Sequence, residues 1–75
     1  MNRNELALIE QIRPTNQQLS RLLQEHEGYE SRLASLARQR WRSAEDYAEE
    51  QRLKRLKLAG RDRIQEILSA HRVGS

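Results

Sequence analysis

The sequence predicts an all-α protein built as an antiparallel two-helix hairpin of the coiled-coil type. Charged residues make up 33% of the chain and hydrophobic residues 36%, with no Phe, which is typical of long amphipathic helices. Val73 is the only Val and Thr15 the only Thr, so a β-sheet would have few β-branched residues to use. The 75 residues allow one domain at most.

The first segment, residues 1–13, is predicted to be a short helix. Four aliphatic residues make it loosely amphipathic: Leu6, Leu8, Ile9 and Ile12. The helix should end at Arg13, because the residue before a proline is disfavoured in the helical conformation. Pro14 suits the first turn of the following helix, where its missing N–H costs nothing.

The second segment, about residues 15–40, has the clearest periodicity in the chain. Its seam residues follow a 3-4 spacing: Leu19, Leu22, His26, Tyr29, Leu33 and Leu36. This a/d pattern over three heptads predicts a helix that packs along one seam against another helix. We interpret His26 as a partly buried polar residue that fixes the register of the two helices.

A turn is predicted at about residues 41–43. Ser43 is followed three residues later by Asp46, and a Ser in this position can cap the first turn of a helix. Trp41 has two interpretations: an exposed anchor for a partner protein, or a plug for the closed end of the hairpin. The plug is the favoured interpretation.

The third segment, about residues 44–71, is predicted to be the second long helix. Its inward face carries Leu53, Leu56, Gly60, Ile64, Ile67 and Leu68. Two long helices joined by a short link are antiparallel neighbours, which places Leu19 opposite the Ile64–Leu68 region. The first segment should then lie at the open end, beside Leu68 and Val73. Residues 72–75 are predicted to be a disordered tail.

Gly60 is the least expected residue on this face, since Gly inside a helix costs about 1 kcal/mol relative to Ala. Two hypotheses explain it. Gly60 makes room for the His26 ring or for the close approach of another chain, or it is a tolerated defect. The first is favoured, and it predicts that Gly60→Leu overpacks the seam and lowers the melting temperature.

The two seams together form a thin core for a chain of this length. Small chains with a single seam usually gain stability by associating. Three large side chains that lie off the seams offer a second contact surface: Leu23, Tyr47 and Leu58. The sequence therefore predicts a homo-oligomer, with a dimer that forms a four-helix arrangement as the favoured state.

Three stretches resemble the YdcH-like family of short bacterial proteins. They are His26–Leu33, the acidic helix start at Ser43–Asp46, and the basic motif Leu53–Ile64. The resemblance implies a helical hairpin and a family without an assigned biochemical activity. The chain departs from the family at Leu56, where a polar residue is usual, and at Gly60, where Leu is usual.

No catalytic, cofactor-binding or metal-binding residues are predicted. The chain has no Cys, and its only imidazoles, His26 and His71, lie far apart in an antiparallel hairpin. Zinc normally takes four N or S ligands, so a metal site would require two chains. Catalysis requires a cleft that shields the reacting groups from water, and a two-helix rod does not form one.

The remaining candidate for function is the basic face of the second long helix. It consists of Arg52, Lys54, Arg55, Lys57, Leu58, Arg61 and Arg63. The favoured hypothesis is an interaction or adaptor module for an unidentified protein partner, without catalytic activity. The alternative is an accessory protein that binds nucleic acid weakly through this face. A small-molecule substrate is not expected, and a role on a membrane surface ranks lower.

The longest apolar run, Leu6–Ile9, has four residues, whereas a membrane-spanning helix needs about 20. The N-terminus also lacks the pattern of a signal peptide. A cytoplasmic location without a membrane span is therefore expected.

Overall fold

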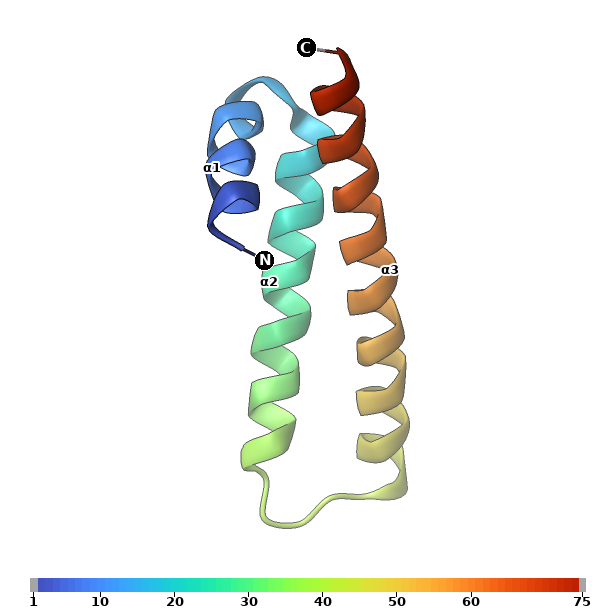
Figure 1. The fold of residues 1–75 in the computed structure, drawn as a ribbon. Helices are drawn as coiled ribbons and strands as arrows, with labels where there is room; N and C mark the ends of the chain where they lie inside the picture. The colour runs from blue at the N-terminus through green and yellow to red at the C-terminus, as the bar shows by residue number, and fades with distance from the viewer. Residues whose placement is uncertain (1, 75) are drawn as a thin grey trace.

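The computed structural model describes residues 2–74, with side chains as far as His71 (Figure 1). Its elements are α1 (Arg3–Ile12), the 3-10 turn η1 (Arg13–Thr15), α2 (Gln17–Arg38) and α3 (Ala44–Gly74). No strand occurs among residues 2–74, so the all-α class is confirmed. This part of the chain is elongated, with extents of 49, 21 and 16 Å.

Helix α1 begins at a side-chain cap. The Asn2 side chain accepts a hydrogen bond of 2.9 Å from the backbone N–H of Glu5, which satisfies one of the free N–H groups of the first turn. The helix ends at Ile12, and its two buried side chains, Ile9 and Ile12, face the rest of the molecule. The first segment is therefore a three-turn helix with one buried face.

Helix α2 begins later than the sequence predicted. The Asn16 side chain accepts a hydrogen bond of 2.9 Å from the N–H of Leu19, and its own backbone is extended. The first helical residue is therefore Gln17, two residues after the predicted start at Thr15. Pro14 lies in η1 and not in the first turn of α2, because the Asn16 cap sets the helix start.

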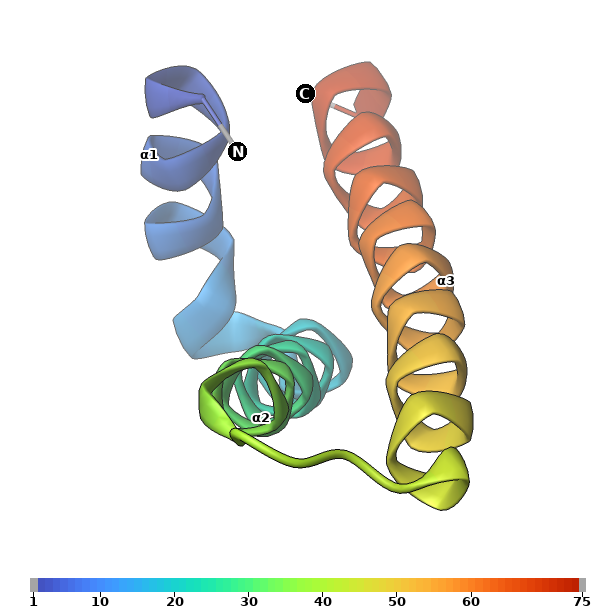
Figure 2. The same cartoon turned by 90° about the horizontal axis from the view of Figure 1, so that it is seen from below.

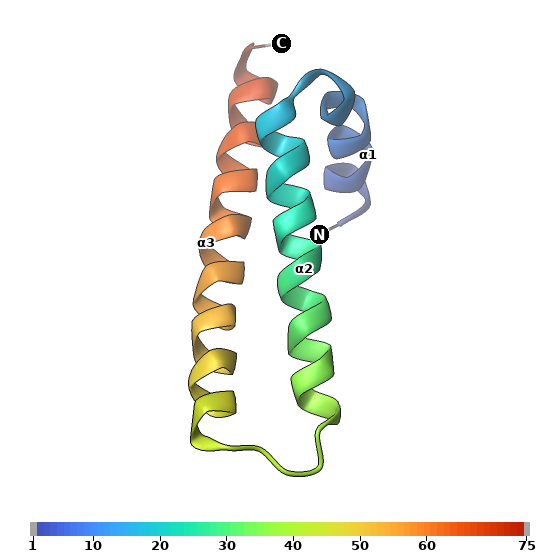
Figure 3. The same ribbon diagram turned by 180° about the vertical axis from the view of Figure 1, so that it is seen from behind.

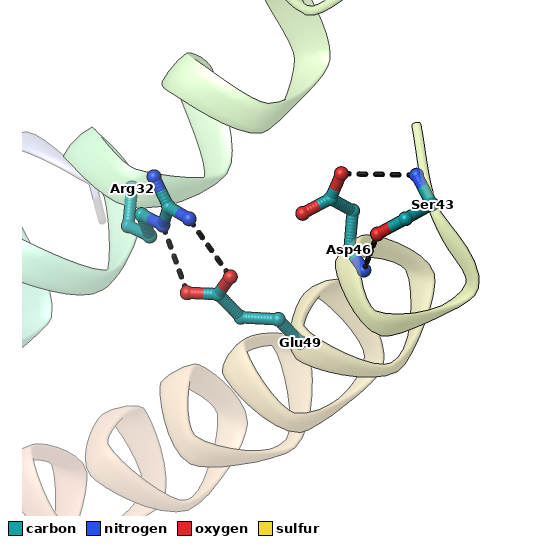
Figure 4. Close-up of polar contacts among 4 residues, drawn as sticks. All are labelled: Arg32, Ser43, Asp46 and Glu49. Atoms are coloured by element: carbon teal, nitrogen blue, oxygen red, sulfur yellow. Dashed lines mark hydrogen bonds and ion pairs between the residues drawn. The ribbon is translucent and has the colours of Figure 1, made fainter. Parts of the chain in front are cut away.

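Residues 39–43 connect α2 to α3. Helix α2 ends at Arg38, because Gln39 leaves the helical conformation with φ −69° and ψ 130°. At the start of α3, the N–H of Asp46 donates to Ser43 Oγ at 3.1 Å, and the N–H of Ser43 donates to the Asp46 carboxylate at 3.0 Å (Figure 4). This reciprocal pair is a capping box with Asp in the usual place of Glu.

Helices α2 and α3 lie side by side and run in opposite directions (Figures 1 and 3). Leu19, near the start of α2, belongs to one buried cluster with Ile64 and Leu68, near the end of α3. Arg32, in the second half of α2, contacts Glu49 in the first half of α3. The contact between Leu19 and the end of α3 follows the expected register.

Helix α1 folds back beside α2 and also contacts α3, so the open end of the molecule contains three helices (Figure 2). The main cluster of the core lies here and consists of five buried residues: Ile9, Ile12, Leu19, Ile64 and Leu68. Partly buried side chains pack around it: Leu8, Leu22, Leu23 and Ile67. The first segment thus lies beside Leu68, as expected, while the Val73 side chain is outside the described residues.

The closed end is built from α2 and α3 alone. Leu36 and Leu53 are its buried hydrophobic side chains, and neither belongs to the cluster at the open end. Between the two ends, the seam side chains are half-buried, for example Tyr29 and Leu33. Most of the core is therefore at one end of a rod.

The helical backbone of α3 continues to Gly74, three residues beyond the predicted boundary at His71. Nothing in the sequence between His71 and Gly74 breaks a helix, since Gly74 is the first residue of low helix propensity in that stretch. Of the predicted tail, Ser75 and the side chains of residues 72–74 lie outside the described residues.

Candidate interaction surface

The predicted seam is buried unevenly. Four of its residues have no exposed surface: Leu19, Leu36, Ile64 and Leu68. A fifth, Leu53, is buried with 8% of its surface exposed. Six others are half-buried: Leu22, His26, Tyr29, Leu33, Gly60 and Ile67. Leu56 is 42% exposed, so its assignment to the seam is wrong. At about 100° per residue, Leu56 is turned about 60° from the buried Leu53, away from the centre of the seam.

Gly60 does not make room for the His26 ring. A Cβ atom built on Gly60 would have no heavy atom of another element within 4 Å. The His26 ring is directed along its own helix instead, with Nδ1 at 3.5 Å from Oε1 of Glu30. Within one chain, the space beside Gly60 is open, which contradicts the His26 half of the favoured hypothesis. The other half, the close approach of another chain, stays a prediction.

Two ion pairs join α2 to α3. The Arg32 guanidinium donates two hydrogen bonds to the Glu49 carboxylate, at 2.8 and 2.9 Å (Figure 4). These hydrogen bonds lower the pKa of Glu49 below its ordinary value. The second pair joins Glu30 on α2 to Lys57 on α3 at 3.5 Å. Pairs at the rim of a seam fix which residues of two helices stand opposite each other more than they stabilise the fold.

Trp41 does not plug the closed end of the hairpin, since 83% of its surface is exposed. It lies in the non-helical connection, where the Arg40 guanidinium is placed over its ring, 6.0 Å from the ring centre. Arg42 packs there instead. Its guanidinium lies 5.1 Å from the centre of the Tyr47 ring and pairs with the Glu50 carboxylate. Sequence reasoning missed Arg42, although its position one residue before Ser43 places it beside the first turns of α3.

The basic face of α3 is only partly neutralised. Three of its cations have acidic partners: Lys54 pairs with Glu50, Lys57 with Glu30, and Arg63 with Glu66. The other three, Arg52, Arg55 and Arg61, are exposed and make no ion pair within residues 2–71. Leu58 lies among these cations with 61% of its surface exposed.

Two shallow hollows lie along the helices, and we name them by the charge of their rims. The basic hollow is lined by Leu33, Lys54, Lys57, Leu58 and Arg61. The acidic hollow lies between α1 and α2 and is lined by Leu6, Ile9, Glu10, Arg13, Leu23, His26, Glu27 and Glu30. Each therefore combines leucine side chains with charges mainly of one sign.

Among residues 2–71, no three His, Asp or Glu side chains are grouped so that they could hold a metal ion. No helix in the described part of the chain is long and apolar enough to cross a bilayer. Comparison with family models, with curated proteins and with solved structures finds no match for this chain.

Proposed function

We propose that this chain is an antiparallel coiled-coil hairpin that associates with a second copy and acts as a non-catalytic interaction module. The observation that carries the proposal is the ratio of exposed to buried apolar side chains. Among residues 2–71, seven hydrophobic residues are buried, whereas five large ones are exposed: Leu6, Trp41, Tyr47, Leu56 and Leu58. Two of them lie beside further leucines, Leu58 beside Leu33 and Leu6 beside Leu23. Apolar side chains grouped in this way are typical of surfaces that bind another protein.

The distribution of the core supports the same conclusion. The buried cluster at the open end uses three helices, while the closed end has two helices and two buried leucines, Leu36 and Leu53. A two-helix arrangement buries only one stripe of each helix, so a further layer from another chain would add apolar burial where it is lacking.

The test is the mass of the protein in solution. Light scattering after size exclusion, over a range of concentrations, should give a mass above the 8.9 kDa of one chain. The helical circular dichroism signal should become more resistant to heat as the concentration rises, because association stabilises the folded state by mass action. A folded monomer whose melting temperature is independent of concentration would contradict the proposal.

The unpaired cations of α3 favour a second candidate function, binding to nucleic acid. Arg52, Arg55 and Arg61 are exposed on one helix and are free to contact phosphates. Binding should then be weak and should fall steeply with salt, with a slope of about −0.9 per phosphate contacted on duplex DNA. Fluorescence anisotropy with mixed-sequence DNA and RNA, at low and at physiological salt, measures this slope.

A triple variant with Arg52, Arg55 and Arg61 replaced by Gln should lose most of that affinity. The matched control replaces three exposed arginines outside this face with Gln: Arg3, Arg21 and Arg38. It therefore lowers the net charge by the same amount as the test variant. Equal losses in the two variants would mean that binding follows net charge and not the α3 face. The resemblance to the YdcH-like family stays a prediction beside both functions.

A further inference from the structure

We propose that self-association joins unlike hollows: the basic hollow of each copy receives the acidic hollow of the other copy around a twofold axis. This inference rests on the proposed function and names the surface that carries it.

The basic hollow has the composition of a docking site for an acidic, apolar surface. Leu58 is 61% exposed beside the half-buried Leu33, which provides an apolar floor. Lys54, Lys57 and Arg61 form the rim, and Arg61 makes no ion pair among the residues whose side chains are described. Apolar contact surrounded by cations favours a partner that brings leucines surrounded by carboxylates.

The acidic hollow of the same chain has that composition. Leu6 is 53% exposed and lies with the half-buried Leu23 between α1 and α2. Glu10 and Glu27 stand on the rim, are exposed, and make no ion pair within residues 2–71. Arg13 is the one arginine that lines the hollow. The charges of the two hollows are therefore mainly of opposite sign, with Glu10, Glu27 and Glu30 in one and Lys54, Lys57 and Arg61 in the other.

The two hollows are neighbours on the molecule. Glu30 lines the acidic hollow, and its carboxylate pairs at 3.5 Å with Lys57, which lines the basic hollow. Two adjacent patches exchange places under a twofold axis that passes between them, which is the geometry of an isologous dimer. An axis near the Glu30–Lys57 pair would bring Leu6 of each copy to Leu58 of the other.

The position of α1 gives this arrangement its shape. Helix α1 lies beside α2 and α3 at the open end and leaves the closed end with two helices (Figures 1 and 2). Exchange of the hollows would place α1 of each copy against the two-helix half of the other. Each copy would then supply the third helix that its partner lacks. A dimer in which basic hollows face each other is disfavoured, because like charges would meet without partners.

The test uses Leu58→Glu, with Leu56→Glu as the matched control. Both are exposed leucines of α3, but Leu58 lines the basic hollow and Leu56 does not. Within one chain, a carboxylate at position 58 has Lys54 and Arg61 as helix neighbours, so the monomer tolerates it. In the dimer, the same carboxylate would meet Glu10 and Glu27. Sedimentation equilibrium should show the dimer dissociation constant rising by at least about tenfold for Leu58→Glu and by less than about twofold for Leu56→Glu.

A charge reversal tests the pairing itself. Arg61→Glu and Glu27→Arg should each weaken the dimer, and the double variant should restore it towards the wild-type dissociation constant. Both residues are exposed and make no ion pair within residues 2–71, so helix content measured by circular dichroism should not change.

The outcomes separate this inference from the proposed function. A wild-type dimer that Leu58→Glu leaves intact, or one that the double reversal does not restore, overturns the paired hollows while self-association stands. A monomeric wild type overturns self-association. If that monomer binds a synthetic acidic amphipathic helix and Leu58→Glu abolishes the binding, the occupant is another protein and not a second copy.

Discussion

Arg32 on α2 and Glu49 on α3 form a two-pronged ion pair, with hydrogen bonds of 2.8 and 2.9 Å between guanidinium and carboxylate. The residues are 17 positions apart in the sequence and lie on opposite sides of the seam. Parallel hydrogen bonds of this kind depend on orientation as well as distance, so they favour one register of α2 against α3 over neighbouring ones. The hydrogen bonds from Arg32 also lower the pKa of Glu49, as those from Arg42 lower the pKa of Glu50.

These lowered pKa values predict that acid destabilises the fold. A carboxylate whose pKa is lower in the folded protein than in the unfolded chain adds stability that is complete above its ordinary pKa of about 4.5. That contribution is lost as the pH falls through the lower, folded-state pKa. The melting temperature should therefore drop as the pH falls below about 4.5. Glu49→Gln should be less stable than wild type at neutral pH, and the difference should vanish in acid.

Glu45→Gln is the control for this experiment, because Glu45 is exposed and makes no ion pair within residues 2–71. Its melting temperature should follow the wild type at every pH. Parallel pH curves for wild type and Glu49→Gln would show that the Arg32–Glu49 pair contributes nothing to stability.

Glycine substitutions test whether anything approaches α3 at Gly60. A Cβ atom at Gly60 or at Gly28 meets no other element within 4 Å, and both residues lie inside helices. Gly60→Ala and Gly28→Ala should therefore each raise stability by about 0.5–1 kcal/mol, through helix propensity alone. Gly60→Leu should also raise the melting temperature. Thermal melts of the three variants measure this. A loss at Gly60 beside a gain at Gly28 would show that a second chain packs closely against Gly60.

The sequence predicted the helices and much of the seam. Apolar residues in α2 recur every three or four positions, and this spacing places them on one face of a helix. The end of α2 was placed about two residues late and its start two residues early. The start was misplaced because Pro14 was used as the start signal and the capping role of Asn16 was missed. The ends of a helix depend on single hydrogen bonds, such as the one that the Leu19 N–H donates to the Asn16 side chain. The spacing of apolar residues does not reveal such bonds.

The surface was harder to predict than the seam. Leu56 fits a heptad spacing in α3, but its exposure depends on how far α3 is rotated against α2, and only the packed pair determines that rotation. The hollow at Leu58 likewise needs Leu33 from the other helix. Trp41 was expected to plug the closed end, whereas Arg42 packs there through its contacts with Glu50 and the Tyr47 ring.

Trp41 is exposed and Arg42 packs at the closed end, so substitutions of these two neighbours should affect stability differently. Trp41→Ala should change stability by no more than about 0.5 kcal/mol, as for other exposed residues. Arg42→Ala should lower the melting temperature, because it removes the contacts with Tyr47 and Glu50. Arg40→Ala is the matched control, since Arg40 is exposed, and its melting temperature should stay close to that of the wild type. Trp41 is also the only Trp, so its fluorescence should be quenched efficiently by acrylamide in the folded protein. A shielded indole would contradict its exposure.

The last prediction compares two leucines that the heptad pattern treats alike. Leu19 has no exposed surface and packs in the three-helix cluster, whereas Leu56 is 42% exposed. Leu19→Ala should lower the free energy of unfolding by about 2–5 kcal/mol, since it removes buried methyl groups and leaves a cavity. Leu56→Ala should cost less than about 1 kcal/mol. The Leu56 side chain is already in contact with water over much of its surface, so its removal exposes little buried apolar surface. Urea unfolding followed by circular dichroism measures both, at one protein concentration so that association contributes equally. A cost at Leu56 as large as that at Leu19 would mean that another chain covers this flank of α3, and the paired hollows would then not be the dimer surface.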